Sequence, residues 1–113
     1  MQKDYPRSDR ISQQIKKELA NAFQSEIKDP ALKSINILEV DVSPCLKFAR
    51  VFFVAHDYDA DEFSKGFKRS MPFLRTYLSK RMTTRGIPRL EFIYDKSFDE
   101  SYKIDQLIKK SLG

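Results

Sequence analysis

The sequence predicts an α+β domain in which a three-stranded sheet packs against helices. Two long segments repeat apolar residues every three or four positions, as amphipathic helices do. Three short segments instead alternate in side-chain character or are rich in Val, Ile, Phe and Tyr, as strands are. The 113 residues include only three glycines and five prolines, so we expect a single domain, residues 1–113, dense in regular structure. The expected order is helix, strand, strand, two helices joined at a kink, strand, and a short C-terminal helix.

The first helix is expected from Arg7 to Lys28. Ser8 or Asp9 can cap its start, and the Asp29-Pro30 pair ends it, because a residue before proline disfavours the helical conformation. Its apolar residues recur every four positions and predict one buried stripe: Ile11, Ile15, Leu19, Phe23 and Ile27.

Two strands of a hairpin are expected at 34–42 and 47–55, joined by a turn that begins at Ser43-Pro44. In the first strand, we expect Leu38, Val40 and Val42 to share the buried face. The second strand has one wholly apolar face, made of Ala49, Val51, Phe53 and Ala55. A third strand is expected at 89–95, after the Gly86-Ile87-Pro88 break, with three residues on one face: Leu90, Phe92 and Tyr94.

Between the second and third strands, one apolar stripe runs through Phe63, Phe67, Met71, Leu74, Leu78 and Met82. Pro72 lies in its middle, where proline removes a backbone hydrogen bond and clashes with the preceding turn. We therefore predict two helical pieces joined at an interhelical kink formed by Ser70, Met71 and Pro72. Residues 97–100 match a helix-capping box, and a short C-terminal helix is expected to turn Ile104, Leu107 and Ile108 inward.

The charges are unevenly distributed along the chain. The net charge is +5, but residues 1–62 carry a net −2 and residues 63–113 a net +7. No acidic residue occurs from Phe63 to Leu90. A field of one sign attracts polyanions, so we expect this segment to bind RNA phosphates. An alternative is a protein-interaction module whose basic face meets an acidic partner protein.

The RNA-binding candidates are the basic residues of this segment, extended by two arginines of the first helix. The strongest are Arg75, Lys80, Arg81 and Arg85; next come Lys65, Lys68 and Arg69, and then Arg7 and Arg10. The aromatic residues fall mainly on predicted core faces, so we expect contact with the RNA backbone and shape more than base stacking.

Residues for catalysis, metal binding or a cofactor are not evident, so we expect a protein that is not an enzyme and needs no cofactor. The only histidine, His56, has no nucleophile elbow to serve. The acidic cluster at 57–62 lacks the glycine and distal glutamate of a calcium loop. A lone cysteine, Cys45, cannot form an internal disulfide and fits a reducing compartment. There is no signal peptide and no membrane span, so we expect a cytoplasmic protein.

Several segments, taken in order, carry a resemblance to a known family. They are Arg7–Ile11, Glu26–Pro30, Glu39–Pro44, Leu46-Lys47, Ala49–Phe52, Phe73–Arg75, Leu78, Arg85, Pro88–Leu90, Phe92 and Tyr94-Asp95. Over residues 7–108 the sequence resembles the ribosome-binding factor A family, and its element order resembles a type-II KH-like domain. The chain departs from the family's usual Ala-x-Gly at the kink, where it has Ser70-Met71-Pro72, and at Cys45, where an acidic residue is common.

The resemblance implies a function as well as a fold. It implies a monomer that binds 16S rRNA in the immature small (30S) ribosomal subunit and assists late assembly and maturation of the 16S rRNA 5′ end, especially in the cold. It also implies release from the free 30S subunit with help from a small-subunit GTPase.

Overall fold

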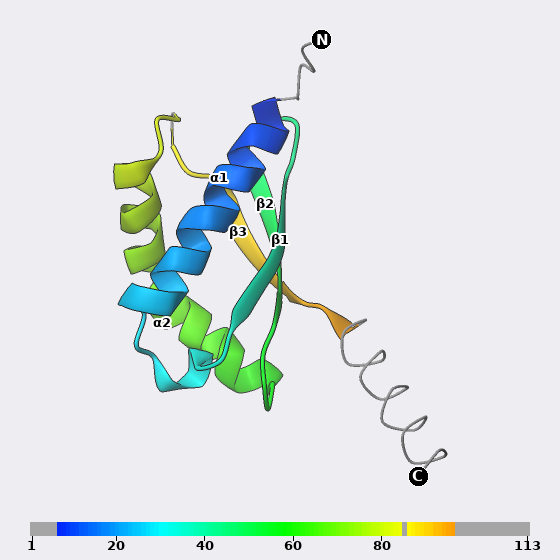
Figure 1. Cartoon of the computed structure of the whole chain (residues 1–113), viewed down its shortest axis with the longest axis vertical. Helices are drawn as coiled ribbons and strands as arrows, with labels where there is room; N and C mark the ends of the chain where they lie inside the picture. The colour runs from blue at the N-terminus through cyan, green and yellow to red at the C-terminus, as the bar shows by residue number, and fades with distance from the viewer. Residues whose placement is uncertain (1–6, 85, 97–113) are drawn as a thin grey trace.

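The computed structural model describes residues 7–84 and 86–96. The elements follow one another as α1 (Arg7–Asn21), the π-helical turn η1 (Ala22–Glu26), the short 3₁₀ helix η2 (Pro30–Leu32), β1 (Asn36–Val42), β2 (Phe48–Val54), α2 (Ala60–Arg81) and β3 (Arg89–Tyr94). In Figure 1, α1 crosses in front of the sheet and α2 lies beside it. The predicted α+β class with a three-stranded sheet is confirmed. The predicted C-terminal helix falls in residues 97–113, outside the described residues.

The sheet has the order β1-β2-β3, with β1 antiparallel and β3 parallel to the central strand. The pairing of β1 with β2 shifts by one residue between Ile37 and Glu39, as a β-bulge does. Leu38 is the extra residue and is only half-buried, whereas Ile37 is buried. The prediction that Leu38 shares the core face is therefore wrong, because the bulge changes which side chains alternate inward.

The core lies between the sheet and the two helices. It joins Ile15 and Leu19 of α1 with Leu74 and Leu78 of α2, all fully buried. Phe53, on the central strand, is 1% exposed and is surrounded by aromatic rings. Five rings lie with centroids 5.2–6.4 Å from that of Phe53: those of Tyr58, Phe63, Phe67, Phe92 and Tyr94.

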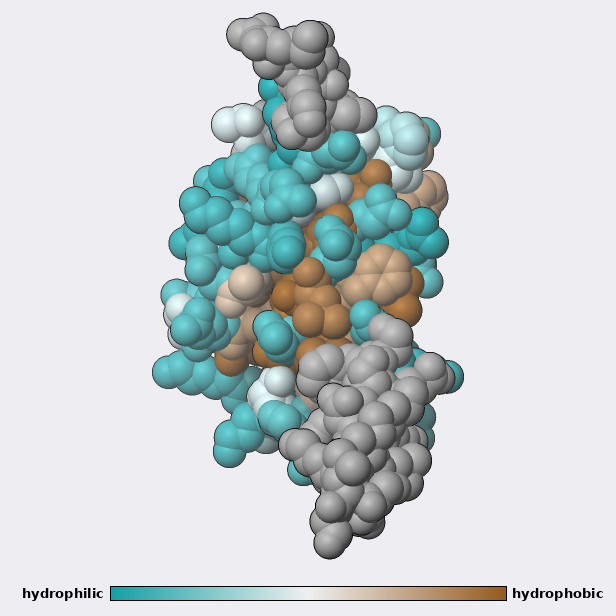
Figure 2. Space-filling view, turned by 45° about the vertical axis from the view of Figure 1, so that its right-hand side comes forward, coloured by the Kyte–Doolittle hydropathy of each residue, from teal (hydrophilic) through white to brown (hydrophobic). Residues whose placement is uncertain are grey.

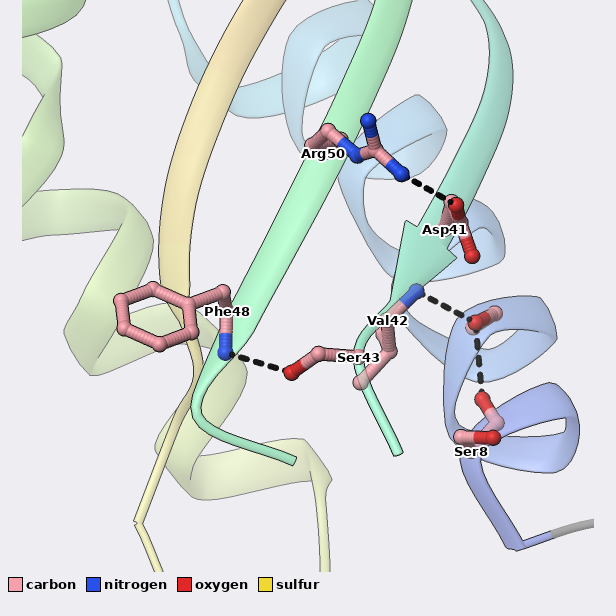
Figure 3. Close-up of polar contacts among 7 residues, drawn as sticks. Ser8, Asp41, Val42, Ser43, Phe48 and Arg50 are labelled. Atoms are coloured by element: carbon pink, nitrogen blue, oxygen red, sulfur yellow. Dashed lines mark hydrogen bonds and ion pairs between the residues drawn. The ribbon is translucent and has the colours of Figure 1, made fainter. Parts of the chain in front are cut away.

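The first helix is shorter than predicted and is fastened to the edge strand β1. Regular α-helix ends at Asn21, and the wider turn η1 continues to Glu26 before Ile27 adopts an extended backbone. The Ser12 hydroxyl donates to the Ser8 carbonyl at 2.7 Å and accepts from the backbone N–H of Val42 at 3.0 Å (Figure 3). Because Ser12 is buried, this pair of bonds satisfies polar groups at the interface of α1 with β1.

The helix α2 is continuous, which corrects the prediction of two separate pieces. It spans Ala60–Arg81 with Pro72 inside it, although its ribbon changes direction midway in Figure 1. Pro72 has no N–H for the carbonyl of Lys68, so one intrahelical bond is lost and the axis can bend there. Ser70 is buried and Pro72 is exposed, so the ring faces solvent while packing holds the inner side helical. The two halves of α2 therefore present their outer faces in different directions.

The segment after α1 packs closely against the first half of α2. A Cβ added to Gly66 would lie 2.9 Å from the Leu32 side chain, so the absence of a side chain permits this approach. Arg69 donates two hydrogen bonds to the Asp29 carboxylate, from Nε at 2.8 Å and from Nη2 at 3.0 Å. These bonds, followed by one from the Ala31 N–H, lower the pKa of Asp29 below its ordinary value. The Arg69–Asp29 ion pair thus adds to the packing of Leu32 on Gly66 in holding η2 against α2.

A core truncation in α2 tests the assignment of its buried face. Leu74→Ala removes a fully buried side chain, and we expect it to lower the free energy of unfolding by about 3 kcal/mol, measured by urea denaturation. Phe73→Ala is the matched control at the adjacent position, because Phe73 is 44% exposed, and it should cost less than about 1 kcal/mol. Equal losses from the two variants would contradict this orientation of α2.

The Arg69–Asp29 pair predicts a specific change in titration. In the folded protein the depressed pKa of Asp29 stabilises the fold above the unfolded pKa of about 4, and this stabilisation disappears as pH falls through the folded value. Arg69→Gln removes the charge and the paired hydrogen bonds, so the pKa of Asp29 should rise toward its ordinary value. Carboxyl chemical shifts followed against pH by NMR measure this directly. An unchanged Asp29 titration in the variant would show that Arg69 does not control it.

Candidate RNA-binding surface

Three basic residues of α2 remain available for a partner. Lys68, Arg75 and Lys80 are all exposed, and none of them forms an ion pair within the described part of the chain. Lys68 belongs to the half of α2 before Pro72, and the other two belong to the half after it. Because α2 bends between its two halves, Lys68 lies on a differently oriented part of the helix surface from Arg75 and Lys80.

Other predicted candidates are already engaged within the protein. Arg69 is held by Asp29, and Arg81 lies 3.4 Å from Glu18 with its guanidinium 3.6 Å from the centre of the Tyr77 ring. Lys65 forms a longer contact, 3.8 Å, with Glu62 on the same helix, and both side chains are well exposed. Such an exposed pair contributes little, so Lys65 can turn to another anion, whereas Arg69 and Arg81 have structural partners.

Arg81 also joins the two helices. Its salt bridge reaches Glu18 on α1, and the Gln14 side chain donates a 3.3 Å hydrogen bond to the Arg81 carbonyl. These contacts, with the burial of Ile15 and Leu78, fix the end of α2 against the middle of α1. Arg85, the remaining strong candidate, is outside the described residues.

The two candidates on α1 lie in different surroundings. Arg10 lines a hollow of about 770 Å³ that also contains the acidic Asp9, Glu39 and Asp41, so its charge is offset by its neighbours. Arg7 lines a second hollow, of about 480 Å³, without any acidic residue. Arg7 and Arg10, three positions apart on α1, therefore lie in different electrostatic surroundings.

An aromatic hollow beside the bend in α2 was not predicted as a functional feature. It has a volume of about 390 Å³ and lies between the first half of α2 and β3. The rings of Phe67 and Phe92 stack with centroids 4.0 Å apart, and Met71 and Lys68 complete the lining. The kink residue Met71 and the cation Lys68 are thus brought to one apolar recess. The spacing of apolar residues in the sequence predicts only that these rings lie in the core. It cannot show that the core is open to solvent between α2 and β3.

The surface formed by residues 7–84 and 86–96 offers few exposed apolar side chains for base stacking. The exposed large apolar residues in the described part are Phe48 and Phe73. Phe48 lies on the open face of the sheet, where Arg50 pairs with Asp41 at 3.1 Å (Figure 3). On the face drawn in Figure 2, hydrophilic residues surround a central apolar area. With Phe48 and Phe73 on separate elements, the described residues form no extended platform for bases, which favours contacts to an RNA backbone.

The groups that would support other chemistry are not assembled in the described residues. Among positions 7–84 and 86–96, no three His, Cys, Asp or Glu side chains lie where they could share a metal ion. His56 is exposed at the end of β2, where its backbone N–H donates to the Ser34 hydroxyl at 3.1 Å. No helix in this part of the chain has the length and apolar character needed to cross a membrane.

Comparison with known proteins places this geometry in a family. A model of the family described as ribosome-binding factor A matches residues 7–108. The ribosome-binding factor A of Methylobacillus flagellatus is 39% identical over 113 residues, covering 99% of this chain and 90% of the relative. That of Thiobacillus denitrificans is 36% identical over 115 residues, with coverages of 100% and 93%.

Solved structures of similar fold belong to the same family. The crystal structure of ribosome-binding factor A from Thermus thermophilus matches with a TM-score of 0.69 at 25% identity, covering 77% of this chain and 93% of that one. A homology model of the Thermus thermophilus protein, fitted into a cryo-EM map of a 30S–ribosome-binding factor A complex, matches with a TM-score of 0.63 at 26% identity, covering 75% and 91%. These matches confirm the expected KH-like fold, and the chain belongs to the ribosome-binding factor A family.

Proposed function

We propose that this chain binds 16S rRNA in the immature small ribosomal subunit and assists its late assembly, including maturation of the 16S rRNA 5′ end. It acts in the cytoplasm, without catalysing a reaction itself, and leaves the free subunit once assembly is complete. The observation that carries the proposal is the run of basic residues without an acidic one from Phe63 to the end of α2, in a member of this family.

The available charges support RNA as the partner. Lys68, Arg75 and Lys80 form no ion pair within the described residues, so each can pair with a phosphate without first breaking a contact. Pairing with phosphates releases condensed counterions, which gives binding a strong dependence on salt. Few aromatic side chains are exposed in the described part of the chain, which favours recognition of RNA by its backbone and shape.

A relative supports the small subunit as the particular RNA target. The Thermus thermophilus protein that matches this fold is fitted into a map of its complex with the 30S subunit. A shared fold alone does not establish the site, which must be argued from the residues present.

The roles of the basic residues follow from their surroundings. Arg75 and Lys80 act as direct phosphate ligands, with Lys65 and Lys68 adding contacts along the first half of α2. Arg85 extends the same acid-free stretch in sequence. Arg69 and Arg81 serve mainly to hold α2 in place through Asp29 and Glu18.

Sedimentation of the tagged protein from growing cells tests the partner. At low salt we expect it to travel with free small subunits and not with translating ribosomes, and to dissociate as the salt concentration rises. Treatment with RNase should release it. Retention on a particle after RNase treatment would instead indicate an acidic protein partner, and sedimentation at the top of the gradient at low salt would contradict the proposal.

A charge reversal tests the site. Arg75→Glu/Lys80→Glu should weaken binding to purified small subunits by at least about tenfold near 0.15 M salt and should reduce the slope of log K against log salt by about 2. The control is Lys28→Glu/Lys33→Glu, which makes the same change in net charge at two exposed lysines in the connection between α1 and β1. If both pairs of substitutions weaken binding equally, net charge rather than this surface determines affinity.

A further inference from the structure

Three segments of the chain meet at one end of the molecule, drawn at the top of Figure 1. They are the first turn of α1, the turn between β1 and β2, and the segment that leads from α2 to β3. Together they line a hollow of about 480 Å³. Its polar lining residues are Arg7, Cys45, Lys47, Thr83 and Thr84, with Gly86 at its rim.

The two charged residues of the lining, Arg7 and Lys47, are both basic. Arg7 and Lys47 are exposed, and neither forms an ion pair within the described part of the chain. The lining contains no acidic residue, and neither do the sequence segments 43–49 and 82–90 that form most of it. The larger hollow beside α1, in contrast, has three carboxylates in its lining, Asp9, Glu39 and Asp41, and one cation, Arg10, although Asp41 also pairs with Arg50. An anion is therefore attracted to the first hollow and not to the second.

Neutral hydrogen-bonding groups accompany the two cations. The Thr84 hydroxyl donates to the Gly86 carbonyl at 3.1 Å, and Gly86 has a φ of 76°, which glycine adopts without strain. Thr83 is exposed, and its hydroxyl can donate to a bound anion. In the opposite turn, hydrogen bonds from the Ser43 hydroxyl and then the Lys47 N–H lower the pKa of the Cys45 thiol. That turn therefore holds hydrogen-bond donors that favour the charged form of Cys45.

The hollow is held in place by contacts described above. Arg7 begins α1, and Thr83 and Thr84 follow the end of α2, whose last residue Arg81 is bound to Glu18. Lys47 is tied to the start of β3 because its carbonyl accepts the N–H of Arg89 at 2.8 Å. The backbone segments that carry Arg7 and Lys47 come from separate elements and border one hollow in the folded chain.

We propose that this hollow binds a phosphate group of RNA through Arg7, Lys47 and the Thr83 hydroxyl, as a second RNA contact beyond the end of the α2 surface. The inference rests on the proposed function and adds a distinct contact to it. The same phosphate chemistry occurs in an internal phosphodiester and in a 5′-terminal phosphate. An internal phosphodiester brings one negative charge, and a terminal monophosphate brings about two at neutral pH.

Charge reversal at the hollow tests the contact. In Arg7→Glu/Lys47→Glu, we expect the affinity for purified small subunits to fall about tenfold near 0.15 M salt, and the salt slope to fall by about 2. Lys28→Glu/Lys33→Glu is again the control of equal net charge, and thermal unfolding of both variants checks that they fold. Losses no greater than those of the control, in a folded variant, would overturn the proposal.

A direct measurement on the intact chain separates this inference from the proposed function. Amide shifts of residues 46, 47, 83, 84 and 86 are followed by NMR while a short oligoribonucleotide is added, with either a 5′-hydroxyl or a 5′-phosphate. Shifts with both oligonucleotides would assign an internal phosphodiester, and shifts with only the second would assign a terminal phosphate. No shift at these amides with either RNA would overturn the proposal, even if the chain binds small subunits. Shifts here in a chain that fails to bind small subunits would overturn only the proposed function.

Discussion

The packing of aromatic rings around Phe53 is the contact on which the rest of the fold depends. Phe53 lies on the central strand and meets rings from the loop after β2, from α2 and from β3. Parallel strands cannot be joined by a tight turn, so α2 must carry the chain from the end of β2 back to the start of β3. The ring cluster sets where the first half of α2 lies on the sheet. It therefore also determines which side of α2 faces outward with its lysines and arginines.

The basic segment serves two purposes that its sequence does not distinguish. Arg69 and Arg81 hold α2 to its neighbours through Asp29 and Glu18, whose side chains are 12% and 14% exposed. Breaking such partly buried pairs leaves a carboxylate without its partner, so these arginines are poorly suited to exchange it for RNA. Lys68, Arg75 and Lys80 form no such ion pair within the described residues. The functional surface is thus smaller than the count of basic residues in the segment indicates.

The sequence predicts most of this fold because periodicity is a local property. The apolar repeats of α1 and α2 and the apolar face of β2 follow directly from side-chain spacing. The bulge that displaces Leu38 was missed because it depends on how β1 pairs with β2. The continuity of α2 through Pro72 was missed because burial of the helix's inner side outweighs the tendency of proline to end a helix. The pairing of Arg69 with Asp29 joins residues 40 positions apart, and side-chain spacing within one segment cannot predict such a contact. The acid-free stretch located the candidate surface, but only coordinates separate its engaged arginines from its available cations.

The parallel pairing of β2 with β3 has a consequence for how the chain folds as it is synthesised. The helix α1 and the hairpin of β1 and β2 are made first, and the two strands of the hairpin pair between residues close in sequence. β3 is the last strand of the sheet to be made, so one edge of β2 has no partner until all of α2 has been translated. Contacts between distant segments slow folding, and an unpaired strand edge is open to association with other chains. The yield of folded protein therefore depends on how quickly α2 packs against Phe53 and delivers β3 to the sheet.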